Sequence, residues 1–185
     1  FATEYRNRVL FDTARNEALK ERAKEMLKTT LDSLSYQLMQ GDFRPACYEL
    51  SFHYLANPSL YGKIDRLDIA EDGDTRYVKV LDYKSGSHTF DISRLYYGLD
   101  LQLAVYLNAA VTAQKEEHPD QTIVPSACFY YEIADPMPES LSLDNPEERM
   151  QAIRKQLRVN GLILEDDAVL EHLDRTQGAE SLAVP

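Results

Sequence analysis

Cysteine is scarce in this chain, and a glycine-rich phosphate loop is absent. The two cysteines, Cys47 and Cys128, lie far apart without CxxC spacing, which indicates neither a disulfide framework nor a zinc site. Each is expected to be a small buried hydrophobic residue. Without a glycine-rich loop the sequence offers no support for ATP binding, and its four histidines show no metal-ligand spacing. Disulfide-stapled, zinc-binding and ATP-binding classes are therefore not favoured.

Long apolar runs are also absent. No stretch is long enough to cross a bilayer and no signal-peptide pattern is present, so a cytoplasmic location is the expectation. With 185 residues, of which 44% are hydrophobic, the chain is long enough for one globular domain with its own core. Because it begins with Phe1 and continues at once into charged helical sequence, we expect it to be a fragment of a longer polypeptide.

Positive charge is in deficit. The 20 Lys and Arg residues stand against 31 Asp and Glu residues, which gives a net charge of -11. Such an excess of acid is unfavourable for a protein that grips a polyanion. A bound divalent cation would offset carboxylates locally, and a partner domain could supply a basic groove. A nucleic-acid substrate is compatible with this composition only if cations come from such sources.

The first half of the chain predicts a long helical region followed by three strands. Apolar side chains recur at helical spacing from residue 5 to residue 40, which indicates one helix or two joined end to end. Alternating patterns predict strands over Tyr48–Tyr54 and Leu60–Ala70. The Asp-Gly pair within Glu71–Asp74 suits a tight turn, so the strand predicted over Thr75–Lys84 should run antiparallel to the strand before it.

The second half returns to helices around one more strand. Periodicity predicts a helix over Leu99–Ala113, and alternation predicts a strand over Pro125–Ile133. Two surface helices are expected over Pro146–Arg158 and Asp167–Leu173, with Asn160-Gly161 as a helix cap between them. The order α, β, β, β, α, β indicates the α/β class. We expect a single domain in three parts: an N-terminal helical segment 1–42, a core 46–134 and a C-terminal helical segment 145–185.

Charged side chains at the end of one predicted strand are the most informative feature of the sequence. Because alternate side chains of a strand share a face, Asp82 and Lys84 project together while Tyr83 points the other way. The part of this strand that precedes them is apolar enough to be buried. Burying an acid and a base at its end costs free energy unless they have partners or a chemical function. The hairpin brings Asp65 toward Asp82. This geometry indicates a metal-dependent nuclease site; the alternative is a strand-end salt bridge worth about 0–1 kcal/mol.

Two carboxylates and a main-chain carbonyl suffice for a hard divalent cation. Mg²⁺ takes oxygen ligands at roughly 2.0–2.1 Å and usually keeps several waters. Asp65 and Asp82 are the candidate carboxylate ligands, and the main-chain carbonyl of Tyr83 is the candidate third ligand. Lys84 would orient the attacking water or stabilise the charge that builds on the phosphate.

Gln102 and Tyr106 stand four residues apart on the next predicted helix and therefore share one face. Their amide and hydroxyl groups could bond to water at the metal, to Lys84 or to a DNA phosphate. The alternative is that Tyr106 belongs to the core and Gln102 is a partly exposed neighbour. Just before them, Tyr96 and Tyr97 could stack single-stranded bases, or could belong to a loop packed on the core.

Several segments together resemble the RecB-type branch of the PD-(D/E)xK nucleases. The motifs are G-K-I-D-R-L-D over Gly62–Asp68, V-L-D-Y-K-S-G over Val80–Gly86 and the Q-x-x-x-Y spacing within Tyr96–Leu107. Within this branch they are most similar to the nuclease domains found in the B subunits of bacterial AddAB-type helicase-nucleases, as are Phe129–Pro136 and Asn160–Leu162. A lone D-x-K would be weak, but these motifs in this order form a specific combination.

The resemblance implies a restriction-endonuclease-like core, in which a mixed sheet is flanked by helices. By the same resemblance, Asp65 and Asp82 match the metal ligands, Lys84 the catalytic lysine, and Gln102 and Tyr106 the Q-x-x-x-Y motif. It implies Mg²⁺-dependent cleavage of a single DNA strand, with Mn²⁺ as a possible substitute, while a helicase-nuclease A subunit unwinds duplex ends for recombinational repair. An iron-sulfur cluster and a further His or Glu on an upstream helix are expected only from parts of the parent outside this chain.

A non-catalytic scaffold of the same fold, which binds DNA or a partner, is the alternative function. The net charge of -11 is compatible with it. A stand-alone exonuclease of the same superfamily is disfavoured, because the resemblance continues after Tyr106.

Overall fold

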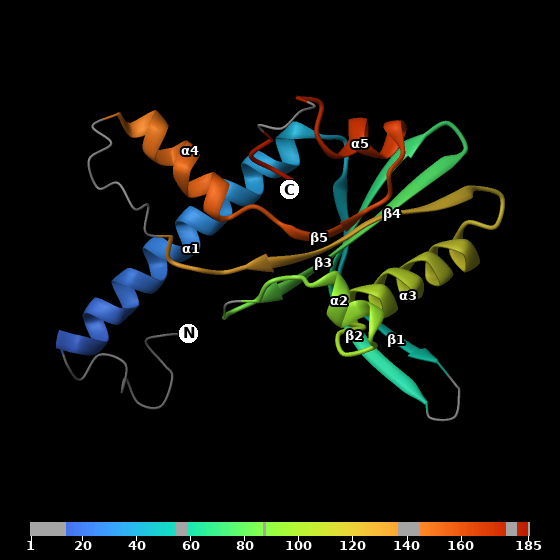
Figure 1. The fold of residues 1–185 in the computed structure, drawn as a ribbon, viewed down its shortest axis with the longest axis horizontal. Coiled ribbons are helices and arrows are strands. Elements are labelled where there is room, and N and C mark those ends of the chain that lie inside the picture. Colours follow the sequence, from blue (N-terminus) through green and yellow to red (C-terminus); the bar gives the residue numbers. More distant parts are fainter. Residues whose placement is uncertain (1–13, 55–58, 87, 137–144, 177–180, 185) are drawn as a thin grey trace.

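The computed structural model describes residues 14–54, 59–86, 88–136, 145–176 and 181–184, and it is built around one five-stranded sheet (Figure 1). The strands lie in the order β1-β2-β3-β4-β5; β3 and β4 run parallel, and the other neighbours run antiparallel. In chain order the elements are α1 Ala14–Gln40, β1 Arg44–Tyr54, β2 Leu60–Asp72, β3 Thr75–Lys84, α2 Ile92–Tyr96, α3 Gln102–Glu117, β4 Thr122–Glu132, α4 Pro146–Gln156, β5 Asn160–Ile163 and α5 Asp167–Leu173. The predicted α/β class, a mixed sheet flanked by helices, is confirmed.

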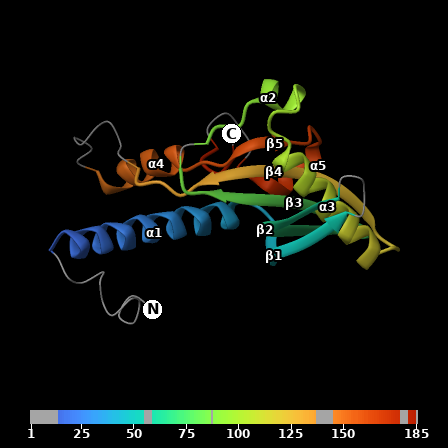
Figure 2. The same ribbon diagram turned by 90° about the horizontal axis from the view of Figure 1, so that it is seen from below.

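Helices cover both faces of the sheet. On one face α3 packs through Leu103 into a buried cluster with Val80 of β3. On the other face α1 and α5 contribute Leu34 and Val169 to a second cluster. In Figure 2, α1 lies to the left of β1 and β2 and below β3 and β4, whereas α2 lies above the strands. None of the helices within the described ranges is long and apolar enough to cross a membrane.

The hairpin and β3 form where the sequence predicted them. β3 occupies the predicted range and pairs antiparallel with β2. Gly73 in the connecting turn has a φ of +55°, a left-handed conformation that glycine adopts without a steric penalty from Cβ. The α5 helix also matches its predicted range. Of the two cysteines, Cys128 is buried as predicted, whereas Cys47 is partly exposed.

The prediction of a helix cap at Asn160-Gly161 is wrong. These residues begin β5, which pairs antiparallel with β4. A Cβ at Gly161 would lie 2.1 Å from the carbonyl oxygen of Cys128, so the glycine permits a close approach of two backbones rather than the end of a helix. The sheet therefore extends beyond residue 134 into the segment that was expected to be helical.

Other boundaries move by a few residues. The helix predicted over Leu99–Ala113 begins instead at Gln102, and the five-residue α2 precedes it. A helix this short carries no helical periodicity to detect. β4 starts at Thr122, before the predicted start at Pro125, and its register with β3 shifts directly after this proline, which cannot donate to the ladder. The part of the predicted N-terminal helix before residue 14 lies outside the described residues.

β2 and β3 separate at the predicted site. Their pairing ends at Arg66 and Leu81, whereas β2 stays paired with β1, and β3 stays paired with β4 to its last residue. β1 and β2 therefore form an arm that leaves the sheet (Figure 1). Asp65 and Asp82 are the next residues beyond the last β2–β3 pair. The divergence of the strands opens space at these two acids.

A buried ion network ties β2 to β3 on the face opposite α3. Arg66 Nε and Nη2 donate to the two carboxylate oxygens of Asp68, each at 2.7 Å, and Lys79 Nζ lies 3.1 Å from Asp68 Oδ2. Arg66 Nη1 also donates to Tyr83 Oη at 2.9 Å. Asp68 is fully buried. Through Arg66, the network fixes the side chain of Tyr83, the residue between Asp82 and Lys84, on the face of the sheet opposite α3.

Candidate active site

Where β2 diverges from β3, the side chain of Asp65 replaces the main-chain pairing with a hydrogen bond of its own. Its Oδ2 accepts from the backbone N–H of Tyr83 at 2.8 Å, so the half-buried carboxylate is held beside β3. Extending the antiparallel register beyond Arg66–Leu81 sets Asp65 across from Asp82. The structure thus brings the two predicted acids to neighbouring positions on diverging strands.

Asp82 is the buried acid of the pair, with 4% of its surface exposed. Its Oδ1 accepts from Gln102 Nε2 at 2.8 Å, and its Oδ2 lies 2.6 Å from Lys84 Nζ. Within the described part of the chain this enclosed Oδ2 has no hydrogen bond of normal geometry, so the ion pair is its compensating contact. Burial raises the pKa of Asp82; Lys84 opposes the rise, and the charge of Asp65 adds to it. A cation at this oxygen would relieve the cost of burying the charge.

Gln102, the first residue of α3, connects the acid to the base. Its Nε2 donates to Asp82 Oδ1 and, at 3.0 Å, to Tyr106 Oη, while its Oε1 accepts from Lys84 Nζ at 2.8 Å. Charge decides this orientation of the amide, because the NH₂ group must face the carboxylate and the carbonyl must face the ammonium. The Tyr106 ring packs edge-on against Phe52 at 5.7 Å, so Tyr106 belongs to the core as well as to the site.

Tyr130 of β4 lies at the site although the sequence did not predict it. Its ring centroid is 5.0 Å from Lys84 Nζ, a cation–π contact, and its hydroxyl donates to Asp100 Oδ1 at 2.8 Å. Burial raises the pKa of Tyr130 above its usual range, and the hydrogen bond to Asp100 adds to the rise. His88 completes the group, with its ring 4.2 Å from that of Tyr130 and Nε2 3.3 Å from Asp100 Oδ2. The parallel β3–β4 pairing puts Tyr130 beside Asp82, and no short-range pattern reveals that pairing.

The oxygen atoms at the opening suit a hard divalent cation. No three His, Cys, Asp or Glu side chains among the described residues form a group that could hold a metal, so the side chains at this opening supply two carboxylates, those of Asp65 and Asp82. The carbonyl of Lys84 points toward β4, where it accepts from Ile133 N at 2.8 Å. Because carbonyl directions alternate along a strand, the carbonyl of Tyr83 points the opposite way, to the side on which its N–H meets Asp65. Asp65, Asp82 and this carbonyl are therefore the oxygen atoms that could hold a cation here, and oxygen is the ligand that hard divalent cations prefer.

Comparison with known families assigns the class of protein. The chain belongs to the PD-(D/E)XK nuclease superfamily, whose family model matches residues 2–183. The two acids and the lysine that the motifs predicted lie on diverging strands, and Gln102 of α3 bonds to Asp82 and to Lys84. The family resemblance seen in the motifs is confirmed.

Its relatives include components of helicase-nucleases. The chain is 42% identical over 170 residues to the B subunit of the ATP-dependent helicase/deoxyribonuclease of Lachnoclostridium phytofermentans, a match that covers 91% of this chain and 14% of that protein. Proteins of the same name from Clostridioides difficile and Alkaliphilus metalliredigens are each 35% identical, over 96% and 98% of this chain and 17% of their own length. The chain thus spans 14–17% of the length of these curated relatives.

Proposed function

We propose that this chain is the nuclease domain of a helicase-nuclease B subunit and that it hydrolyses phosphodiester bonds of single-stranded DNA with Mg²⁺. The observation that carries the proposal is the meeting of Asp65, Asp82 and Lys84 where β2 and β3 diverge, with Gln102 bridging acid and base. Burying an acid and a base at strand ends is a weak source of stability. Their convergence therefore supports a chemical task over a purely structural ion pair.

The cation is proposed to bind between Asp65, Asp82 and the carbonyl of Tyr83, with Mn²⁺ as a possible substitute. When bound, it would polarise the phosphate and lower the pKa of water. Asp82 must be ionised to act as a ligand. Because burial raises its pKa, cation affinity should fall as the pH falls through that raised value.

Lys84 is proposed as the catalytic lysine. Its ammonium is held at 2.6 Å from Asp82 Oδ2 and 2.8 Å from Gln102 Oε1, so its position is set before a substrate arrives. A preorganised positive charge beside the phosphate stabilises the negative charge that develops in the transition state. Gln102 and Tyr106 complete the proposed catalytic group, the amide by orienting Asp82 and Lys84 and the hydroxyl by holding the amide.

Replacing Gln102 by Glu is expected to slow DNA cleavage about 10–100-fold, the loss typical of a partner that orients a metal ligand. A second carboxylate would then face Asp82 Oδ1 in place of a donor, and would raise the pKa of Asp82 further. Initial rates on a labelled oligonucleotide measure the effect. Gln151→Glu, the same change at an exposed position on α4, is the matched control. A wild-type rate for Gln102→Glu would contradict the bridging role.

The wider assembly is part of the proposal. The single strand would come from duplex ends unwound with a helicase-nuclease A subunit for recombinational repair in the cytoplasm, and an iron-sulfur cluster would belong to parts of the parent outside residues 1–185. The relatives' names, which join helicase and deoxyribonuclease, support this setting. With a net charge of -11, most of the grip on the DNA backbone must come from bound cations and other domains.

Metal removal tests the proposed function. The complete gene product that carries residues 1–185 is expected to degrade single-stranded DNA with Mg²⁺ or Mn²⁺, to stop when EDTA is added, and to recover when Mg²⁺ is restored in excess. A time course on an end-labelled strand measures the loss and the recovery. DNA binding without cleavage under both metals would favour the non-catalytic scaffold instead.

A further inference from the structure

We propose that Tyr96 and Tyr97 form a platform on which bases of single-stranded DNA stack next to the proposed active site. This inference rests on the proposed nuclease function and adds the surface that presents the strand. The platform comprises the two tyrosines at the end of α2, with exposed apolar neighbours at Ile92, Leu99 and Leu101.

The exposure of these side chains is unusual for the chain. Of the fourteen large hydrophobic side chains that are exposed among the described residues, five lie within the ten residues 92–101. Tyr96 is 82% exposed and Tyr97 is 73% exposed, which excludes the alternative that they pack on the core. Their rings contact each other edge to face, with centroids 5.2 Å apart and planes at 82°. A concentration of exposed apolar side chains in one short segment, with two aromatic rings in contact, is typical of an interaction site.

The platform is anchored to the candidate site. Asp91 caps α2 by accepting from Ser93 N at 2.8 Å. Beyond the tyrosines, Asp100 accepts from Tyr130 Oη and lies 3.3 Å from His88 Nε2, and Tyr130 in turn contacts Lys84 through its ring. The segment that carries the tyrosines is therefore tied, two positions before α3 begins, to the residues around the lysine.

Single-stranded DNA fits this surface better than duplex DNA or a charged protein. Base-to-aromatic stacking tolerates any sequence and requires unpaired bases with free faces. It also requires few cations, which suits a chain with a net charge of -11. Arg94 is exposed in the middle of α2, where its guanidinium can form an ion pair with a phosphate of the stacked strand. The surface thus offers aromatic faces and one cation on a segment that Asp100 connects to the residues around Lys84.

Photocrosslinking tests the platform without requiring cleavage. The complete gene product carrying Asp82→Asn is mixed with an oligothymidine that contains 5-iododeoxyuridine, irradiated, digested and mapped by mass spectrometry. Adducts on Tyr96 or Tyr97 are expected. Adducts confined to segments outside residues 92–101 would overturn the inference, whatever the outcome of the nuclease assay.

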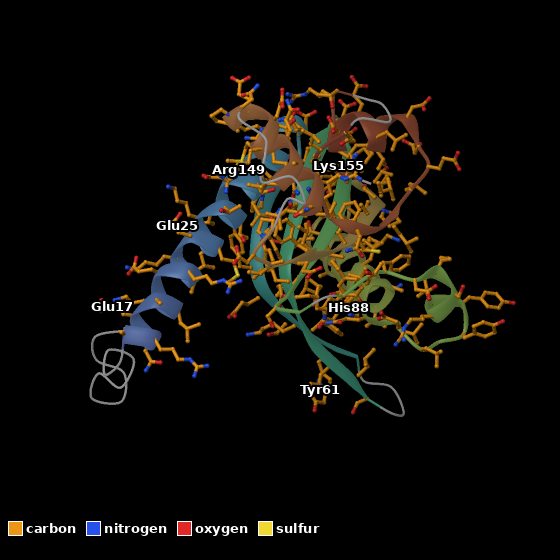
Figure 3. All side chains as sticks on the ribbon, turned by 60° about the vertical axis from the view of Figure 1, so that its left-hand side comes forward. Glu17, Glu25, Tyr61, His88, Arg149 and Lys155 are labelled. Atoms are coloured by element: carbon orange, nitrogen blue, oxygen red, sulfur yellow. The ribbon has the colours of Figure 1, made fainter. Side chains whose placement is uncertain are left out.

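Kinetics supply the second arm. The double variant Tyr96→Ala/Tyr97→Ala is expected to raise the KM for single-stranded DNA at least about 10-fold with kcat within about 2-fold, because stacking contributes binding rather than chemistry. The pair Tyr96→Phe/Tyr97→Phe should behave as wild type, since it keeps the rings. Tyr61→Ala is the matched control: Tyr61 is 80% exposed, but it lies on the β1–β2 arm (Figure 3). An unchanged KM in the alanine pair, or loss of association with the helicase partner in place of DNA affinity, would contradict stacking.

Discussion

Replacing Asp82 by Asn is expected to reduce DNA cleavage by well over 100-fold, a greater loss than the 10–100-fold typical of residues that only orient a metal ligand. The amide is uncharged, so it would neither bind a divalent cation as a carboxylate does nor pair with Lys84 at 2.6 Å. Rates of oligonucleotide cleavage with Mg²⁺ measure the loss. Asp120→Asn, the same change at an exposed carboxylate after α3, should cleave like wild type. Retained cleavage in Asp82→Asn would refute the proposed role of Asp82.

Asp82→Asn should lose nuclease activity without losing folding stability. The pKa of Asp82 is raised in the folded state by burial, so its contribution to stability is fully present below the ordinary aspartate pKa of 3.8 and is lost as pH rises through the folded value. At neutral pH without metal the ionised side chain therefore opposes folding. Urea unfolding in EDTA at pH 7 should show Asp82→Asn at least as stable as wild type. A marked destabilisation would mean that Asp82 has a structural role.

Removing Asp68 is expected to destabilise the domain by about 3–5 kcal/mol, the cost of leaving buried charge without its partner. Asp68 is fully buried and compensates both Arg66, through two hydrogen bonds of 2.7 Å, and Lys79, at 3.1 Å. In Asp68→Ala both cations would remain enclosed without an anion. Urea unfolding of Asp68→Ala against wild type measures the change in the free energy of unfolding.

A second substitution separates charge from packing. Burial lowers the pKa of Lys79, and Asp68 opposes that shift, so the charged lysine depends on Asp68. Lys79→Met should therefore restore part of the stability lost in Asp68→Ala, in a double-mutant cycle. Glu21→Ala, which removes an exposed ion pair with Lys24, should have a much smaller effect than Asp68→Ala. If Lys79→Met restores no stability, the destabilisation of Asp68→Ala comes from the cavity left by the Asp68 side chain and not from the unpaired charge of Lys79.

Local signals predicted the acids and the lysine of the candidate site. The Asp-Gly turn sets a short hairpin, and alternation along β3 puts Asp82 and Lys84 on one face. Both depend only on residues close in sequence. The network around Gln102 was only partly predictable: spacing on the helix pairs it with Tyr106, but its bonds to Asp82 and Lys84 depend on how α3 packs on the sheet.

Long-range pairing could not be deduced in this way. Asn160-Gly161 is a residue pair typical of helix caps. In the structure, however, β5 pairs with β4, and the absence of a side chain at Gly161 allows the two backbones to approach closely. The ring of Tyr130 contacts Lys84 because β4 runs parallel to β3, from which it is separated in the chain by α2 and α3. Such strand pairings depend on how much apolar surface the complete sheet buries against its helices, and a local sequence pattern does not indicate this.

By itself, then, the sequence determined the α/β class, the hairpin, and the acid and base on β3, because turn conformation and side-chain alternation are properties of neighbouring residues. The tertiary structure alone decided that β2 diverges from β3 at Asp65, that the carboxylate of Asp65 accepts a hydrogen bond from Tyr83 N–H, and that Tyr96 and Tyr97 are exposed. Those features arise where distant strands and helices compete for the same buried surface, and only the assembled fold settles that competition.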